Sequence, residues 1–171
     1  MLSLLKLDDM RDASAWTALT NDTTGLAASA VRLTDSYSLE FDKVDGAANG
    51  VTSGAYRTID VNLSQELIQI HDVVSFAMYC SAITNVASAH VKIGTDASNH
   101  YTFSVADTAL NTVGWSLCSV AVGDAALVGT GWNPAAITYL AVGAIFDGES
   151  NALANIKFDC VQISAAPYTR T

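Results

Sequence analysis

The stretch at residues 56–63, YRTIDVNL, alternates outward-type and inward-type side chains at every position. Every second residue of the stretch would lie on one face: Arg57, Ile59, Val61 and Leu63. Because successive side chains of an extended chain point to opposite sides, this period of two predicts a β-strand with one buried face. Residues 72–81, DVVSFAMYCS, are apolar on both faces, which predicts an internal strand of a sheet.

Similar short runs of β-forming residues recur along the chain, separated by clusters of Gly, Asn, Asp and Ser. This spacing is typical of an all-β sandwich, so we expect about nine strands in two antiparallel sheets packed face to face. Very little helix is expected, in short turns at 12–19, 64–70 and 133–137. The expected strands are 29–33, 37–42, 56–63, 72–81, 89–94, 100–105, 115–122, 138–146 and 155–164, the last with a bulge near Asp159.

No linker, repeat or low-complexity tract divides the sequence, which has 171 residues and two prolines. A single domain over residues 1–171 is therefore expected. Residues 1–12 are predicted to form either a first strand or an N-terminal arm, and residues 165–171 a C-terminal tail. The arm and the tail could pair with the sheet edge of a neighbouring chain.

The charge balance argues against several classes of partner. Eight Lys and Arg face seventeen Asp and Glu, a net charge of −9, and the basic residues are scattered. Nucleic acids and anionic membranes are bound by clustered cations, so neither is an expected partner. No window approaches the roughly 18 apolar residues of a membrane span, and no secretion signal is visible. With only 15% charged residues, the surface either suits extensive protein contact or is merely neutral.

The residues that carry chemistry form no recognisable catalytic set. The histidines, His71, His90 and His100, show no metal-binding spacing, and His90 and His100 are interpreted as a surface pair across a hairpin. Nucleophile elbows and phosphate-binding glycine loops are missing from the sequence. The three cysteines, Cys80, Cys118 and Cys160, lie in apolar runs and are expected to be small buried hydrophobes. The sequence therefore predicts a protein that is not an enzyme, without a cofactor or a metal.

The order of short motifs gives a further indication. After Trp16 come SYSLEF (36–41), RTIDVNLS (57–64) and DVVSFAMY (72–79), followed by VKIGTDASNHYTF, GW, ITYLAVGAIF and NIKFDCVQI. This series resembles the jelly-roll sandwiches of the galactose-binding-like group, which occur as carbohydrate-binding modules and as decoration (cement) and tail proteins of bacteriophages. The resemblance implies a jelly-roll fold, but its motifs encode no chemistry.

The same resemblance implies a structural calcium ion between the N-terminal loop and the last strand. It nominates Asp159, with Asp9 or Asp12 as partner, and we assign no ion on this ground alone.

Exposed aromatic rings are the candidate contacts for a glycan or a protein partner. Trp132, Tyr56, Tyr139 and Tyr168 are the candidates, since rings of this kind stack on sugars and anchor protein interfaces. Trp132 lies in a Gly- and Asn-rich loop, where it either is exposed or closes one end of the sandwich. Other aromatic residues have core-like positions and are interpreted as packing: Trp16, Trp115, Phe76, Phe103 and Phe158.

Two functions of different classes follow as hypotheses. The first is a non-enzymatic virion protein, a bacteriophage capsid decoration protein that binds between coat subunits. Its partners would be the major capsid protein and further copies of the chain, as a trimer or dimer on the capsid exterior after assembly in the host cytoplasm. The alternative is a carbohydrate-binding module, either free or part of a phage tail.

Overall fold

The computed structural model describes residues 4–34, 37–44, 50, 52–64, 71–146 and 152–164, and all structural statements below concern these residues. They form twelve strands in two antiparallel sheets of six strands each. Three single-turn 3₁₀ helices connect some of the strands: η1 (Ala13–Ala15), η2 (Asp107–Ala109) and η3 (Val122–Asp124). Within the described ranges, no helix has the length and apolarity needed to cross a membrane.

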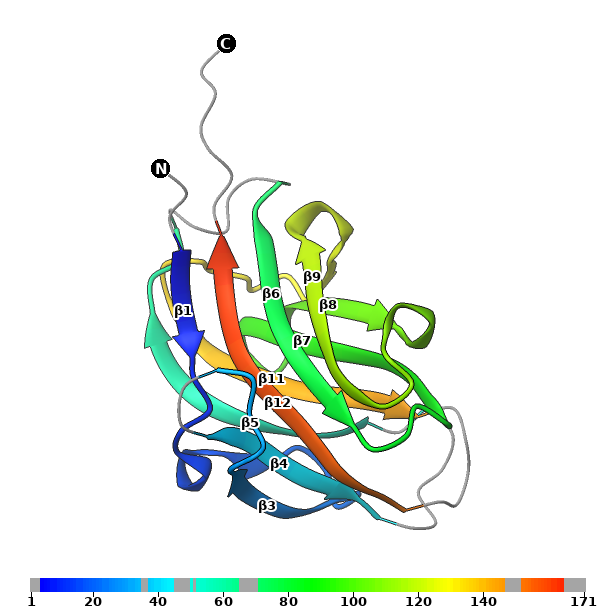
Figure 1. Cartoon of the computed structure of the whole chain (residues 1–171). Helices are drawn as coiled ribbons and strands as arrows, with labels where there is room; N and C mark the ends of the chain where they lie inside the picture. Colours follow the sequence, from blue (N-terminus) through cyan, green and yellow to red (C-terminus); the bar gives the residue numbers. More distant parts are fainter. Residues whose placement is uncertain are drawn as a thin grey trace.

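The two sheets lie face to face, and their strands cross in Figure 1. In sheet 1 the order is β3-β4-β12-β6-β9, with β1 beside the end of β12. Sheet 2 has the order β10-β8-β7-β11-β5-β2. The strands of sheet 1 are β1 (Leu4–Asp8), β3 (Thr23–Ser29), β4 (Ser38–Lys43), β6 (Val73–Cys80), β9 (Gly114–Ala121) and β12 (Leu153–Ser164). Those of sheet 2 are β2 (Thr17–Ala18), β5 (Thr52–Val61), β7 (Val86–Asp96), β8 (Asn99–Ala106), β10 (Ala126–Val128) and β11 (Ile137–Phe146).

One hydrophobic core lies between the sheets. On the side of sheet 1, Phe158 stacks between two other rings: its centroid is 6.0 Å from that of Phe41 and 6.1 Å from that of Phe76. All three side chains are buried because β4, β12 and β6 are neighbours and present these residues to the inner face. Sheet 2 closes the core with aliphatic side chains and two rings, among them Val91, Ile93, Phe103, Leu140, Val142 and Phe146.

Most of the predicted strands are confirmed. The alternating stretch lies in β5, where Tyr56 and Thr58 are exposed, and the doubly apolar stretch forms β6, which is internal to sheet 1. The hairpin of β7 and β8 has the expected position. The bulge near Asp159 is also present, since the pairing of β12 with β6 shifts register after Asp159 and Cys160 has φ +52°.

The predicted strand at 29–33 is wrong. Pairing with β4 begins at Thr23 and ends at Ser29. The reason lies in Asp159, whose carboxylate accepts hydrogen bonds from the backbone N–H groups of Leu33 and Thr34, at 2.8 and 2.7 Å. These N–H groups are therefore committed to a side chain rather than to a strand ladder.

The number of strands is twelve rather than about nine. Eight of the nine expected strands are present, the one at 29–33 is not, and four further strands occur: β1, β2, β3 and β10. The N-terminal residues 4–8 do form a strand, β1. The helical turn expected at 12–19 is limited to η1, which Asp12 caps by accepting from Ser14 N at 3.0 Å. At 133–137 the chain makes one hydrogen-bonded turn, from Ala136 N to Asn133 O at 3.1 Å. The turn predicted at 64–70 and the tail at 165–171 lie almost wholly outside the described residues.

Trp115 departs from its expected place in the core. It is only partly buried, on the outer face of sheet 1, where its ring lies edge-on to Tyr79 with centroids 5.6 Å apart. Residues of β9 alternate, and the inward positions are taken by Ser116, Cys118 and Val120. The Tyr79 ring also covers the ammonium of buried Lys157, 4.9 Å from its centroid, and Lys157 pairs with Glu40 at 2.7 Å. These contacts join side chains from four strands of sheet 1: β9, β6, β12 and β4.

Candidate functional site

Two tyrosines from different strands meet on the outer face of sheet 2. Tyr56 on β5 pairs with Ala141 on β11, and Tyr139 on β11 pairs with Thr58, so the two rings are diagonal neighbours. Their centroids are 5.9 Å apart with planes inclined by 32°. Tyr56 is 36% exposed and Tyr139 is partly exposed. Two adjacent, partly exposed rings form a surface on which a flat apolar group can stack.

Three nitrogen-bearing side chains lie beside the tyrosines on the same face. His100 on β8 pairs with Gly94, and its ring centroid is 6.0 Å from that of Tyr139. Lys92 on β7 is two residues before Gly94, and the strand neighbours of Lys92 are Thr102 and Ala141. His90 lies two residues before Lys92 on β7, and its side chain points to the same face. We call this set the tyrosine face; its members are Tyr56, Thr58, His90, Lys92, His100, Thr102, Ser104 and Tyr139.

His90 is fully buried, and neither of its ring nitrogens has a hydrogen-bond partner. A Cβ built on Gly143, its neighbour across β11, would lie 3.3 Å from Nε2, so the ring occupies the space that this glycine leaves. Burial lowers the pKa of His90 to about 3, and the charges of Lys92 and His100 add to the effect. His90 is therefore a neutral imidazole at ordinary pH.

The other two groups have shifted pKa values for related reasons. Burial lowers the pKa of the half-buried Lys92. For His100, burial and then Lys92 lower the pKa, against the carbonyl of Ala97 and the carboxylate of Asp96, which raise it. Nδ1 of His100 has no partner. The centre of the tyrosine face thus offers rings, hydroxyl groups and nitrogen donors around one lysine.

Of the residues predicted as contacts, the structure brings Tyr56 and Tyr139 together and places Trp132 elsewhere. The Trp132 ring lies edge-on to Tyr101, with centroids 4.9 Å apart and planes at 83°, and it packs partly buried against the core. Its loop is fixed to the β7–β8 hairpin, since Gly131 N donates to Asn99 Oδ1 at 2.7 Å. Trp132 therefore closes one end of the sandwich. Tyr168 lies outside the described residues.

Sequence reasoning missed Lys92 and misplaced the two histidines. His90 and His100, interpreted as a surface pair, are 0% and 5% exposed. One signal was available in the sequence: Gly94, Ala141 and Gly143 fall at alternate positions of two strands. Small residues there leave room for large side chains on the neighbouring strands.

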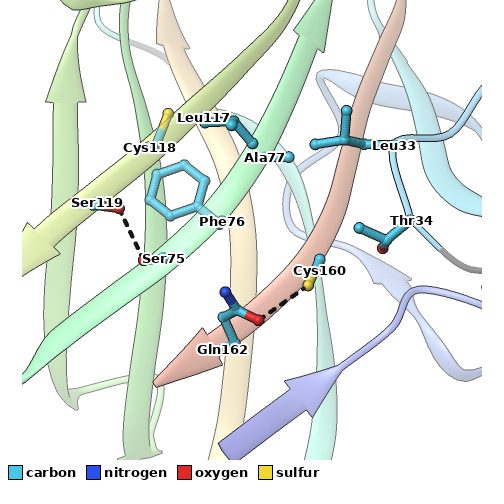
Figure 2. Close-up of a pocket in the computed structure, with 10 residues that line it drawn as sticks. All are labelled: Leu33, Thr34, Ser75, Phe76, Ala77, Leu117, Cys118, Ser119, Cys160 and Gln162. Carbon is cyan, nitrogen blue, oxygen red and sulfur yellow. Dashed lines mark hydrogen bonds between the residues drawn. The ribbon is translucent and has the colours of Figure 1, made fainter. Parts of the chain in front are cut away.

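A second candidate site is an apolar pocket of about 280 Å³ on the outer face of sheet 1 (Figure 2). Leu117, whose side chain is 79% exposed, lies at its edge, and Leu33 faces it from the segment before β4. The hydroxyl groups of its two serines, Ser75 and Ser119, are already bonded to each other at 2.8 Å. Its lining has neither a charged side chain nor an exposed aromatic ring: Leu33, Thr34, Ser75, Phe76, Ala77, Leu117, Cys118, Ser119, Cys160 and Gln162.

The calcium site implied by the resemblance does not fit these side chains. Asp159 is fully buried, and its oxygens accept two backbone N–H groups and the hydroxyl of Thr34, at 2.9 Å. Asp12 caps η1, and Asp9 pairs with Arg11 at 2.9 Å. In the described parts of the chain, no group of three or more His, Cys, Asp or Glu is placed to hold a metal ion.

No protein-family model matches the sequence, and no curated protein sequence is significantly similar to it. Solved structures do match the fold. The family 30 carbohydrate-binding module of a cellulosomal cellulase of Clostridium thermocellum superposes with a TM-score of 0.59 at 11% identity, covering 95% of this chain and 98% of that one. The family 11 module from the same organism, solved with a β-1,3-1,4-mixed-linked tetrasaccharide, gives 0.59 at 10% identity, covering 95% and 96%.

Part of one enzyme matches equally well. An exo-β-agarase superposes with a TM-score of 0.59 at 10% identity, covering 96% of this chain but only 26% of the enzyme. The fold therefore occurs both as separate modules and as domains of larger glycoside-degrading proteins. At these identities the likeness establishes the architecture, and the chain has the jelly-roll β-sandwich fold of carbohydrate-binding modules.

Proposed function

We propose that this chain is a carbohydrate-binding module whose ligand lies on the tyrosine face. The observation that carries the proposal is the pair Tyr56 and Tyr139, two partly exposed rings 5.9 Å apart on adjacent strands of one sheet. The C–H groups on one side of a pyranose ring form an apolar surface that stacks on such rings, while its hydroxyl groups bond to polar neighbours. Thr58, Thr102 and Ser104 supply those neighbours on the same face.

The pocket on sheet 1 is the weaker candidate for a sugar. It lacks an exposed ring, and the Phe76 side chain at the pocket is only 2% exposed. Its two serine hydroxyls already bond to each other. The structural likeness to carbohydrate-binding modules supports the proposed function, because proteins with this fold include modules that bind sugars. It does not by itself distinguish between the two sites.

The proposed role is binding without catalysis. Hydrolysis of a glycoside requires two carboxyl groups on either side of the scissile bond. The central rows of the tyrosine face hold histidines, a lysine and hydroxyl groups instead. The hypothesis of a capsid decoration protein, with its coat-protein partner, self-association and virion location, stays a prediction; the named structures favour the alternative.

The test is to remove the rings one at a time. Tyr56→Ala and Tyr139→Ala are each expected to weaken binding by roughly tenfold or more, because truncating an anchoring ring typically costs 2 kcal/mol or more, and about 1.4 kcal/mol is tenfold. Affinity electrophoresis in gels containing soluble polysaccharides measures this directly. The panel includes mixed-linkage β-1,3-1,4-glucan, arabinan, homogalacturonan and galactans with and without sulfate.

A matched control lies on the opposite sheet. Leu117→Ser removes an exposed side chain from the rim of the apolar pocket and is expected to leave binding unchanged. If it abolishes binding while both tyrosine variants bind normally, the ligand lies on sheet 1 and the assignment is wrong. Failure of the native protein to be retarded by any of these polysaccharides would refute the proposed function.

A further inference from the structure

Lys92 differs from the other cations of the described chain in what surrounds its ammonium. Arg57 pairs with Asp8, Lys157 with Glu40 and Arg11 with Asp9. In a chain with seventeen acidic residues against eight basic ones, carboxylates are plentiful. Within the described residues, however, no carboxylate and no hydrogen-bond acceptor pairs with Lys92, although its side chain is half-buried. A partly desolvated charge without a counterion is unfavourable.

The side chains around Lys92 add no negative charge. Across β8 and β11 its direct neighbours are Thr102 and Ala141. Along β7 the next outward residue is His90, which is fully buried and has two unpartnered ring nitrogens. His100 on β8 also has an unpartnered nitrogen. Three nitrogen-bearing groups are therefore gathered on one face without a carboxylate among them.

Two carboxylates lie on strands of the same sheet, Asp96 on β7 and Asp60 on β5. Asp96, at the end of β7, accepts from Asn99 Nδ2 at 2.9 and 3.0 Å and from Ser98 N at 2.7 Å. Asp60 is exposed on β5, four residues beyond Tyr56. Neither carboxylate pairs with Lys92 in this structure. Among the described residues, no carboxylate therefore accepts from the ammonium of Lys92, which is left to solvent or to a ligand on this face.

We propose that the tyrosine face binds an anionic saccharide, with the sugar ring stacked on Tyr56 and Tyr139 and its carboxylate or sulfate group held by the ammonium of Lys92. Ala141 separates the two parts of the site, because it is the strand neighbour of both Tyr56 and Lys92. Its small side chain leaves the space between ring and ammonium to the ligand. This inference rests on the proposed function and specifies the chemical class of its ligand.

The test compares each anionic polymer with its neutral counterpart. De-esterified homogalacturonan is paired with the fully methyl-esterified polymer, and a sulfated galactan with the same galactan after desulfation. The native protein is expected to bind the anionic member of at least one pair roughly tenfold more tightly at low salt, since a charge-assisted hydrogen bond contributes about 1.5–3 kcal/mol. The preference should shrink as ionic strength rises. Isothermal titration calorimetry gives both affinities.

Variants locate the anion. Lys92→Met keeps the unbranched shape and most of the length of the side chain. It is expected to abolish the preference while binding to the neutral polymer persists, and Lys92→Arg should retain the preference. Lys6→Met, which removes an exposed cation from β1 on sheet 1, is the matched control for net charge and should behave like the native protein.

The outcomes separate the two proposals. Equal affinity of the native protein for charged and neutral polymers would overturn the anionic ligand and leave the carbohydrate-binding role standing. An anionic preference that survives in Lys92→Met would overturn the role of Lys92. Binding to none of the polymers would overturn both proposals together. The pair that shows the preference tells whether carboxylate or sulfate is the group recognised.

Discussion

Replacement of Phe158 by alanine is expected to destabilise the fold by about 3–5 kcal/mol, the usual cost of deleting a buried aromatic side chain. Phe158 is fully buried and stacks on both Phe41 and Phe76, so its removal leaves both rings with a cavity beside them. Since domains of this size are stable by only about 5–15 kcal/mol, the variant would retain a small margin. Urea unfolding followed by circular dichroism measures the loss.

Two further variants make this result interpretable. Phe158→Leu keeps part of the side-chain volume and should lie between the native protein and the alanine variant. Leu117→Ala truncates an exposed side chain of sheet 1 and is expected to change stability by less than about 0.5 kcal/mol. A loss below about 1 kcal/mol for Phe158→Ala would contradict the stack as a main element of the core.

The second large effect is a loss of stability on acidification that depends on His90. Burial lowers the pKa of His90 to about 3 in the folded protein, whereas an unfolded histidine titrates near 6.5. Below pH 6.5 the unfolded chain therefore binds a proton that the folded chain does not, and the free energy of unfolding falls as the pH falls towards 3. From pH 7 to pH 5 this one group should remove about 2 kcal/mol.

The contribution of His90 is isolated by difference. His90→Phe keeps a ring of similar shape and loses no hydrogen bond, because neither imidazole nitrogen has a partner. Urea titrations at pH 7, 6 and 5 should show the native protein losing about 2 kcal/mol more than the variant over this range. If the larger ring prevents folding, His90→Leu serves in its place. Parallel pH profiles for native and variant proteins would contradict the proposed burial of a neutral His90.

The sequence was informative where side chains alternate and where both faces of a stretch are apolar. The stretch in β5 and the phase slip at Asp159 follow from the period of two, which burial imposes on a two-layer sandwich, whereas β6 was predicted from its two apolar faces. It failed at β3, where the strand TTGLAAS has no alternating pattern and Gly25, at φ +65°, interrupts the register with β4. Strand pairing there is decided by tertiary contacts and not by local pattern.

The candidate site was predictable only in part. The tyrosines were identified as exposed rings, because large rings outside the core pattern are visible in a sequence. Their meeting, and their proximity to Lys92, depend on the register between β5, β11 and β7, which no local pattern specifies. His90 was misplaced for the same reason: its burial results from the position of Gly143 on a strand more than fifty residues away.

The two outer faces of the sandwich point in opposite directions, and this has a practical consequence. Position 117 is highly exposed and belongs to sheet 1, whereas Tyr56 and Tyr139 belong to sheet 2. A fluorophore or a surface tether attached at position 117 through an introduced cysteine would lie on the face opposite to the two tyrosines. The protein could then be immobilised in one orientation, with its other side open to polymers in solution.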